Sequence, residues 1–354
     1  MRAASFALAV LQNRTGAVPR PGLVTYLVTY RCNARCGMCD SWRLKPGAEL
    51  TPADAATVFG KIGRLDAVRL SGGEPFLRED FAEIADAVVR ASDPLILHVT
   101  TNGSFPDRVE RFAAGVARRE RLRVMVSLDG LPDEHDANRG ADVTFALALE
   151  TIARLQAIGV HVSVNHTVIS AQSLNDAPAL KRRLSALGVD VHAVLAYADS
   201  AMYGLKLRGT RAEHLIAPRG YPLHPALAGA DAIGFVEREL QDLPQVRDRG
   251  TRLGKRYYLR GLRDRLRGVE DPRPHPRCVA LRSHLRLLPD GRVPVCQFNT
   301  ETIGNLLTQS FDEVWHGAEA RRSRAWVDAC KGCWAECEVL PSALYTGDLL
   351  RALQ

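Results

Sequence analysis

The chain has 354 residues, of which 46% are hydrophobic and 25% charged, a composition typical of a soluble globular protein. Its length allows one large domain, or a large domain with a smaller one. No window approaches 18 consecutive apolar residues, so no membrane-spanning helix is predicted and no membrane partner is expected.

The net charge of +7 is concentrated in residues 247–277, which hold eleven Lys or Arg and four Asp or Glu. Such a segment can bind nucleic acid or an anionic substrate. Because no stacking-aromatic motif lies beside it, a solvated helix face with a basic loop is favoured, and a nucleic-acid partner is not expected. The apolar residues 3–11 lack an A-x-A cleavage site, so they are interpreted as an N-terminal helix and the protein as cytoplasmic.

Strand and helix patterns alternate strictly from residue 23 to residue 198. The predicted strands are 23–30, 67–70, 95–103, 121–130, 160–168 and 189–198. The predicted helices between them are 51–65, 78–91, 107–119, 144–159 and 173–188. This alternation indicates an α/β protein with a parallel sheet and crossover helices, either a β/α barrel or a doubly wound sheet.

Unusual residues gather at or just after the ends of these predicted strands. They are Cys32, Cys36, Cys39, Gly72, Gly73, Glu74, Asn102, Ser127, Asp129 and Asn165. In a barrel the carboxyl ends of the strands converge on one face, which is where barrel active sites form. The placement favours a partial (β/α)6 TIM-like barrel over the doubly wound sheet.

The alternation stops near residue 200, and four regions are predicted: an N-terminal helical extension at 1–21, the barrel at 22–199, a basic connecting region at 200–277 and a small C-terminal domain at 278–354. Within the last two, residues 252–267 and 311–327 have helical patterns. Residues 285–297 resemble a β-hairpin, with a Pro-Asp-Gly turn between two apolar runs.

Eight cysteines form two clusters, which points to metal rather than to a disulfide framework spread along a small secreted chain. Cys32, Cys36 and Cys39 have the spacing C-x3-C-x2-C. Three thiolates can bind zinc with a fourth ligand from elsewhere, or three irons of a [4Fe–4S] cluster whose fourth iron stays open. The spacing favours the cluster, because zinc motifs usually pair one C-x2-C with another.

These motifs carry a resemblance to a known family. C-x3-C-x2-C directly after the first strand of a β/α series resembles the signature of the radical S-adenosylmethionine (SAM) enzymes. Three further motifs follow in the family's order, each after a predicted strand: "SGGEP" at 71–75, "TTNG" at 100–103 and "VSLDG" at 126–130. The resemblance covers residues 22 to about 198.

The resemblance implies that SAM chelates the open iron of a cluster ligated by Cys32, Cys36 and Cys39. Gly72 and Gly73 would allow close backbone approach, and Glu74 would accept hydrogen bonds from the SAM ammonium group.

Other SAM contacts are implied further along the chain. Ser127 and Asp129 are placed like the family's ribose-contacting residues, and Asn102 and Asn165 are candidate contacts of the SAM carboxylate or ribose. Met38 stands where the family often has an aromatic residue near the adenine, so the stacking surface differs here.

The C-terminal cysteines resemble the auxiliary-cluster extension called SPASM, or its shorter form, twitch. Cys278 and Cys296 fit C-x12-G-x4-C, and C-x2-C-x3-C follows at Cys330, Cys333 and Cys337. A full SPASM extension has seven cysteines and two clusters, so five cysteines imply one auxiliary [4Fe–4S] cluster. Its expected ligands are the first four, with Cys337 as a spare thiol able to replace either of the last two. A zinc site is the alternative.

The resemblance implies an enzyme that cleaves SAM reductively to a 5′-deoxyadenosyl radical, which abstracts hydrogen from a substrate. A small molecule such as an aminosugar or aminocyclitol is the leading substrate, and a ribosomal peptide the alternative. Candidate substrate contacts are Tyr197, Asp199, Tyr203 and His214. An electron donor such as flavodoxin or ferredoxin is implied.

Two readings of other classes compete with the enzyme. One is a non-enzymatic, metal-stabilised nucleic-acid-binding protein, against which the ordered motifs speak. The other is an electron-transfer protein with two clusters, which would not explain six β/α units.

Overall fold

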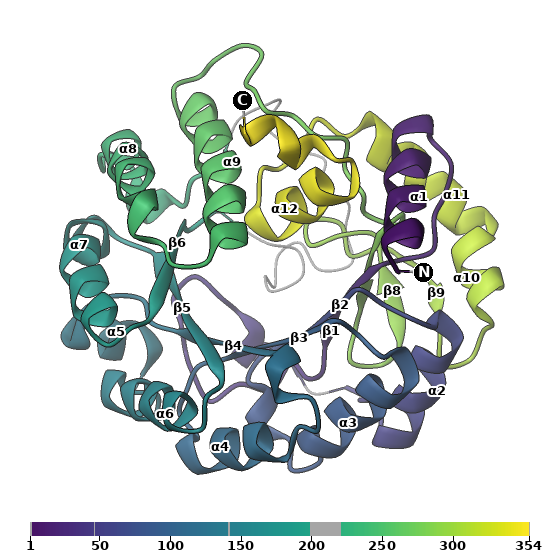
Figure 1. Cartoon of the computed structure of the whole chain (residues 1–354), viewed down its shortest axis with the longest axis horizontal. Helices are drawn as coiled ribbons and strands as arrows, with labels where there is room; N and C mark the ends of the chain where they lie inside the picture. Colours follow the sequence, from purple (N-terminus) through teal and green to yellow (C-terminus); the bar gives the residue numbers. More distant parts are fainter. Residues whose placement is uncertain (1, 46, 141, 199–220, 354) are drawn as a thin grey trace.

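The molecule is built around a curved parallel sheet (Figure 1). The structure, a computed structural model, describes residues 2–45, 47–140, 142–198 and 221–353. The strand order in the sheet is β6-β5-β4-β3-β2-β1-β7. These strands are β1 (Leu23–Leu27), β2 (Ala67–Ser71), β3 (Ile96–Thr101), β4 (Leu122–Ser127), β5 (His161–Val168), β6 (Asp190–Leu195) and β7 (His284–Leu287). The edge strands β6 and β7 do not pair with each other, so the curved sheet stays open and forms a partial TIM barrel. The predicted fold class is confirmed.

Helices cover the convex, outer face of this sheet (Figure 1). They are α2 (Pro52–Ile62), α3 (Phe81–Ser92), α4 (Pro106–Gly115), α5 (Pro132–Arg139), α6 (Phe145–Ala157) and α7 (Ala171–Ala186). Alternate strand residues point to opposite faces, and on β2 the outward pair Val68 and Leu70 is fully buried in the main core. The same core includes Val58 and Phe59 of α2. Burial of these apolar side chains is what bends the chain back into successive β/α units.

Local signals set the start of these helices. Thr51 and Asp54 form a reciprocal capping box at the start of α2, with Pro52 at its first position. Ser170 and Ser173 cap α7 in the same way. Helices α2 and α7 therefore begin where the sequence places its capping residues.

The remaining helices and two short strands complete the ring between the two ends of the curved sheet (Figure 1). They are α1 (Arg2–Thr15), α8 (Ala232–Asp242), α9 (Arg249–Leu266), β8 (Arg292–Pro294), β9 (Thr302–Asn305), α10 (Phe311–His316), α11 (Ala318–Ala329) and α12 (Glu336–Tyr345). Helix α1 is the predicted N-terminal helix, and its Asn13 donates to Ser283 Oγ and to Tyr345 O, which fastens it to the C-terminal segment.

The predicted hairpin at residues 285–297 is confirmed only at its Pro-Asp-Gly turn, where the backbone N–H of Gly291 donates to Leu288 O; its two arms belong to different sheets. Its first arm, β7, pairs in parallel with β1 of the barrel, and its second arm, β8, pairs antiparallel with β9. Leu285 and Leu287 of β7 are fully buried in the main core. The first arm therefore forms β7 by pairing with the open edge of β1, because this pairing buries Leu285 and Leu287.

The predicted helix at residues 311–327 is broken in two at Gly317, whose extended backbone ends α10. Among the described residues, no helix is both long and apolar enough to cross a membrane.

Candidate active site

The first cysteine loop, residues 28–45, follows β1 at the carboxyl end of the sheet. Cys32, Cys36 and Cys39 are all free of disulfides, and they pack with Ala34 and Val143 in one small apolar cluster. Burial raises the pKa of Cys32 to about 12 and that of Cys39 to about 11. Without metal these groups are therefore neutral thiols, and metal binding must release their protons.

Gly72 and Gly73 lie directly beneath this loop. The backbone N–H of Gly73 donates to Thr29 O, and that of Glu74 donates to Arg31 O. A Cβ on Gly72 would collide with Thr29 O, and one on Gly73 would collide with Arg31 O. The two glycines thus let the end of β2 press against the chain leading into the cysteine loop.

The carboxylate of Glu74 is completely buried and accepts three hydrogen bonds. The donors are the Thr101 hydroxyl at 2.8 Å and the backbone N–H groups of Asn102 at 2.7 Å and Phe76 at 3.1 Å. Burial raises the pKa of Glu74 to about 7, against the effect of these donors. Glu74 therefore joins the end of β2 to the end of β3 beneath the loop.

Asn102 reaches the cysteine loop itself. Its Nδ2 donates to Asn33 Oδ1 at 2.9 Å, while its Oδ1 accepts from the backbone N–H and the hydroxyl of Ser104. Asn33 also donates to the Ser104 hydroxyl. Asn102 and Ser104 thus hold the residue next to Cys32.

Asp129 is buried at the end of β4 and is held by the last turn of α5. Arg139 donates to both of its carboxylate oxygens, at 2.7 and 3.0 Å, and Asn138 Nδ2 donates to it at 2.7 Å. Burial disfavours the charged carboxylate, but the charge and hydrogen bonds of Arg139 outweigh it and lower the pKa of Asp129. The pair is therefore ionised.

The same two residues of α5 bind the cysteine loop. Asn138 Oδ1 accepts from the backbone N–H of Gly37, and the Arg139 carbonyl accepts from that of Arg35. Nδ2 of Asn138 also lies 3.7 Å from the Met38 sulfur. Sequence reasoning missed Asn138 and Arg139, because no local pattern singles them out at the end of a short helix.

Ser127 and Asn165 occupy one register position on the adjacent strands β4 and β5. Asn165 donates to Thr167 Oγ1, and Ser127 is buried. Neither contacts the cysteine loop through a hydrogen bond among the described residues. His166 Nε2 lies 3.2 Å from the carbonyl oxygen of Asp129, so the buried ring has a hydrogen-bond partner.

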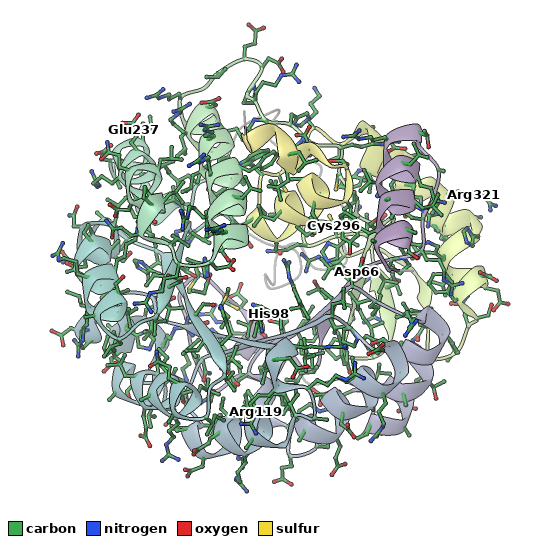
Figure 2. The ribbon with its side chains drawn as sticks, viewed as in Figure 1. Asp66, His98, Arg119, Glu237, Cys296 and Arg321 are labelled. Atoms are coloured by element: carbon green, nitrogen blue, oxygen red, sulfur yellow. The ribbon has the colours of Figure 1, made fainter. Side chains whose placement is uncertain are left out.

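The C-terminal cysteines come from three separate segments. Cys278 precedes β7, Cys296 follows β8, Cys330 and Cys333 follow α11, and Cys337 lies in the first turn of α12. None forms a disulfide. Figure 2 places Cys296 beside α12, toward the interior of the barrel.

All five thiols lie in buried surroundings, and Cys296, Cys333 and Cys337 pack against the same cluster of Phe298 and Ala335. Burial is the main cause that raises the pKa of every one of them. Among the smaller causes, Cys330 contributes to the raised pKa of Cys278, and Cys296 and Cys278 contribute to the raised pKa of Cys333. Burial raises the pKa of Cys337, and the positive charges of Arg286 and Arg69 oppose this rise. The Cys337 thiol also donates to Gln297 Oε1 at 2.7 Å.

Trp334, next to Cys333, fastens this loop to α9. Its ring is buried against Tyr258 and under the Arg265 guanidinium, and its Nε1 donates to Tyr258 O. A Cβ on Gly261 would collide with the same ring. The loop between Cys330 and Cys337 is thus held by aromatic packing on a helix far away in the sequence.

The donor sets fit iron–sulfur clusters. Thiolates are the ligands of [4Fe–4S] clusters, and both sets stand in enclosed surroundings. Within the described ranges, no three Cys, His, Asp or Glu side chains are gathered tightly enough to hold a single metal ion. Ligands of a cluster bind different irons and need not meet at one point.

Of the predicted substrate contacts, the structure describes Tyr197. Its phenol contacts Gln297, and its ring packs on Phe298 at a centroid distance of 5.4 Å. It therefore lies beside the C-terminal cysteines. Asp199, Tyr203 and His214 lie outside the described residues.

Much of the basic segment is engaged within the protein. Arg267 pairs with Glu237, Arg277 with Asp328, and Lys255 with Glu336. Arg265 covers Trp334. These contacts give the positive charge of α9 a structural role.

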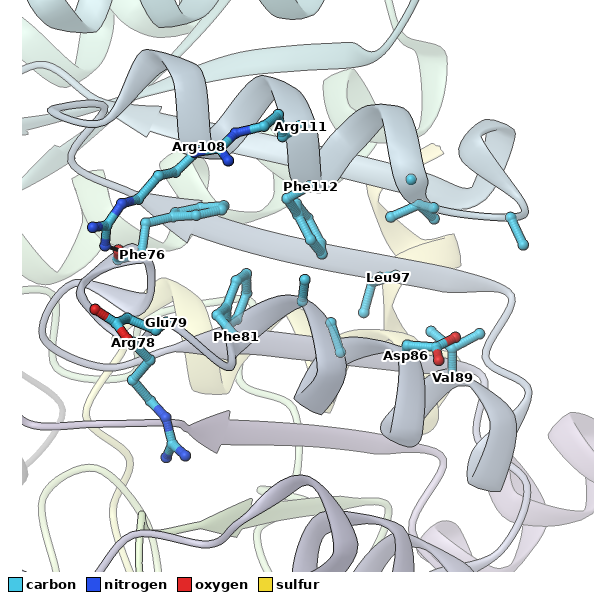
Figure 3. A pocket seen from close by; sticks show the side chains of 15 residues that line it. Phe76, Arg78, Glu79, Phe81, Asp86, Val89, Leu97, Arg108, Arg111 and Phe112 are labelled. Carbon is cyan, nitrogen blue, oxygen red and sulfur yellow. Dashed lines mark hydrogen bonds between the residues drawn. The ribbon is translucent and has the colours of Figure 1, made fainter.

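A pocket of about 450 Å³ lies on the outer side of the sheet, between α3 and α4 (Figure 3). Phe76, Phe81 and Phe112 line it, with Arg108 and Arg111 beside them. It shares no residue with either cysteine site, so it is separate from the candidate active site.

Comparison with known proteins agrees with this geometry. A model of the radical SAM superfamily matches residues 26–184, and a model of SPASM, an iron–sulfur cluster-binding domain, matches residues 278–334. The second match includes Cys278, Cys296, Cys330 and Cys333 and ends before Cys337.

Two curated relatives illustrate different extents of similarity. GTP 3',8-cyclase of Aquifex aeolicus is 32% identical over 175 residues, which is 46% of this chain and 52% of that protein. Mycofactocin maturase MftC of Mycobacterium ulcerans is 28% identical over 355 residues, which is 90% of this chain and 85% of that protein. This chain spans about half the length of several curated relatives that it matches.

Among solved structures, Streptococcus suis SuiB bound to S-adenosylmethionine superposes with a TM-score of 0.63 at 13% sequence identity. The superposition covers 92% of this chain and 72% of that chain. At this identity the similarity shows a common fold.

Proposed function

The chain belongs to the radical SAM superfamily, and from this premise we propose that it cleaves SAM at the loop of Cys32, Cys36 and Cys39. The observation that carries the proposal is the convergence of three strand ends on that loop. Gly73 and Glu74 after β2, Asn102 after β3, and Asp129 after β4, acting through α5, each support it.

Cys32, Cys36 and Cys39 would hold a [4Fe–4S] cluster, which when bound and reduced would supply the one electron needed to split SAM into methionine and a 5′-deoxyadenosyl radical for hydrogen abstraction from the substrate. We propose flavodoxin or ferredoxin as the electron donor. The protein's own part begins with Arg139, whose positive charge lies close enough to Cys36 and Cys32 to favour their thiolate forms. The ion pair with Asp129 holds that charge in place.

The polar groups around the loop are proposed to orient SAM. Gly72 and Gly73 are proposed to expose backbone groups to its methionine part, with Glu74 fixed beneath them. Asn102, Ser127, Asp129 and Asn165 are proposed to line the carboxylate and ribose side, and Met38 the adenine side. The contacts of Asp129 with Asn138 and Arg139 support an orienting role, because both partners also bind the loop.

For the auxiliary [4Fe–4S] cluster we propose Cys278, Cys296, Cys330 and Cys333 as ligands. Their mutual electrostatic influence supports this set, and the contact of Cys337 with Gln297 supports leaving the fifth thiol out.

The substrate is proposed to be a small molecule of the aminosugar or aminocyclitol kind. A ribosomal peptide is the second candidate. Two observations favour it: the similarity to mycofactocin maturase MftC extends over 90% of this chain, and SuiB, which shares the fold, has been solved with its precursor peptide SuiA.

The proposal is tested by measuring iron after anaerobic reconstitution, together with reductive SAM cleavage. About eight irons are expected in the wild type and about four in the triple variant Cys32→Ala/Cys36→Ala/Cys39→Ala, which should not cleave SAM. The matched control, Cys278→Ala/Cys296→Ala, should also lose about four irons but still cleave SAM. Zinc in the wild type, or iron unchanged by the triple substitution, would refute the proposal.

The two substrate candidates are separated by asking which fraction of a cell extract stimulates 5′-deoxyadenosine formation. Stimulation by molecules below about 1 kDa that resist protease favours the small molecule. Stimulation that protease treatment abolishes favours the peptide.

A further inference from the structure

A row of polar residues crosses the concave face of the sheet at one register level. Arg286 of β7 lies opposite Thr25 of β1 in the strand register, and Thr25 lies opposite Arg69 of β2. Arg69 in turn lies opposite His98 of β3. The row ends with Arg123 of β4 and His161 of β5. Because the residues before and after Arg69 face the outer core, Arg69 itself faces the interior.

Most cations around this interior are neutralised or bound elsewhere. Arg286 pairs with Glu338 at 2.8 Å, and Lys255 of α9 pairs with Glu336 at 2.9 Å. The Arg123 guanidinium turns to the rim, where it donates to the carbonyls of Glu120 and Leu122.

Arg69 is the exception. Its side chain has no hydrogen bond or ion pair with the described residues, and Arg69 is partly buried. Burial lowers the pKa of Arg69, and the nearby positive charge of Arg286 acts in the same direction. A guanidinium nevertheless keeps its proton in proteins, so an unpaired positive charge stands inside the barrel. Such a charge is costly to bury unless an anion or a hydrogen-bond acceptor meets it.

His98 adds a second unsatisfied group beside it. The side chain points toward the interior of the barrel (Figure 2), and its Nδ1 is buried without a hydrogen-bond partner in the described part of the chain. Burial, and then the charge of Arg69, lower the pKa of His98 to about 3, so the ring is neutral. A neutral imidazole offers one further hydrogen bond to whatever Arg69 binds.

The position of Arg69 lies between the two cysteine sites. Its strand leads directly into Gly72, Gly73 and Glu74 beneath the first cysteine loop. Two of the charges that act on its side chain, those of Glu336 and Glu338, belong to the first turn of α12 on the auxiliary side. A molecule held here would therefore reach toward both sites.

We propose that Arg69 and His98 form a recognition site for an anionic group, a carboxylate or a phosphoryl group, of the substrate. This inference rests on the proposed function, because the anionic molecule would be the substrate from which the radical abstracts hydrogen. A planar guanidinium binds either group through two parallel hydrogen bonds.

The test measures binding of succinate and of inorganic phosphate to the reconstituted, SAM-loaded protein by calorimetry at low ionic strength. At least one of the two anions should bind to the wild type, and it should bind at least tenfold more weakly to Arg69→Gln. Its affinity for Arg69→Lys should be intermediate, because lysine keeps the positive charge but cannot form two parallel hydrogen bonds. His98→Leu should weaken binding a few-fold. Tighter succinate binding indicates a carboxylate substrate, and tighter phosphate binding a phosphoryl substrate.

Arg123→Gln is the matched control, because it removes an arginine of the same row whose guanidinium is bound at the rim. Its anion affinity should equal that of the wild type. The proposal is overturned if neither anion binds to the wild type, if Arg69→Gln and Arg69→Lys both bind as tightly as the wild type, or if SAM displaces the anion. Loss of the auxiliary irons in both Arg69 variants would overturn it too, by assigning Arg69 to the cluster.

Iron content and SAM cleavage are measured on the wild type in the same preparations. If SAM is not cleaved while anion binding still depends on Arg69, the proposed function fails and the anion site stands. If SAM is cleaved and the anion is not bound, only the anion site fails.

Discussion

The two cysteine sites of this molecule are held in different ways. The first loop is held by polar contacts from strand ends that lie next to one another in the barrel, chiefly Gly73, Asn102 and the Asp129–Arg139 pair. The C-terminal cysteines come from three segments, and Trp334 fixes one of these by aromatic packing on α9. A site held by buried ions should fail abruptly when one partner is removed, whereas a packed side chain can shift and lose less.

The largest effect is expected from Asp129→Ala. It leaves the buried Arg139 guanidinium without its counter-charge and frees the last turn of α5 from β4. We expect a loss of about 3–5 kcal/mol in the free energy of unfolding, together with the irons of the first site. Urea titration and iron analysis measure both quantities.

Asp133→Ala on the same helix is the control for that change, because Asp133 is exposed. It should keep both iron content and stability. If Asp129→Ala instead retains all its irons, the ion pair does not hold the loop.

A smaller effect is expected from Gly73→Ala. The added Cβ would collide with the Arg31 carbonyl, a backbone atom that moves only if the loop leading to Cys32 moves. We expect destabilisation of about 1–3 kcal/mol and partial loss of iron and SAM cleavage. Gly60→Ala in α2, where a Cβ meets no atom within 4 Å, should be neutral or stabilising. Equal behaviour of the two variants would show that close approach at Gly73 is not required.

Gly261→Ala tests the other region. Its Cβ would collide with the Trp334 ring, which can shift as a side chain, so we expect about 1–2 kcal/mol of destabilisation. Iron should be lost from the auxiliary site, while SAM cleavage at the first site continues. Gly254→Ala in the same helix meets only Leu340, at 3.6 Å, and should retain every iron. Loss of SAM cleavage in Gly261→Ala would mean that the two sites are not independent.

A further effect, which depends on pH, concerns the contact between the two regions at His284 of β7. This ring lies 2.9 Å from Thr25 Oγ1 and 3.3 Å from Glu338. Burial lowers the pKa of His284 to about 4, although the hydrogen bond with Glu338 opposes the shift. A lowered pKa means that the folded state prefers the neutral ring, so its contribution is complete above about pH 6.5 and is lost as the pH falls toward 4.

We therefore expect the wild type to lose up to about 1.4 kcal/mol per pH unit from this group between pH 6.5 and 4. His284→Gln should show a shallower decline in urea midpoints, while His161→Gln, at an exposed position, should follow the wild type. Identical slopes in all three proteins would contradict this assignment.

Local patterns were sufficient to predict much of the barrel. The six strands and most of the crossover helices follow from periodicity and from caps such as Thr51, because these signals act between near neighbours in the chain. The hairpin prediction for residues 285–297 found the turn but not the strand pairing, because the partner of β7 is β1, which the local pattern cannot indicate.

The candidate site shows the same division. Cys32, Cys36 and Cys39, with "SGGEP", could be singled out by their spacing, and the structure brings the end of β2 beneath the cysteine loop. Arg139 and Asn138 could not, although they bind both Asp129 and the loop. An arginine near the end of a helix has no distinctive pattern until folding shows what it faces.

The sequence by itself determined the α/β alternation, the two clusters of thiols and the order of the motifs, because each depends on spacing along the chain. Only the tertiary structure decided that β7 pairs with β1, that Trp334 packs against Gly261, and that the Arg69 side chain faces the interior without a partner among the described residues. These facts depend on which surfaces meet once the sheet curves, and the burial of charge and apolar area selects those contacts over the whole chain.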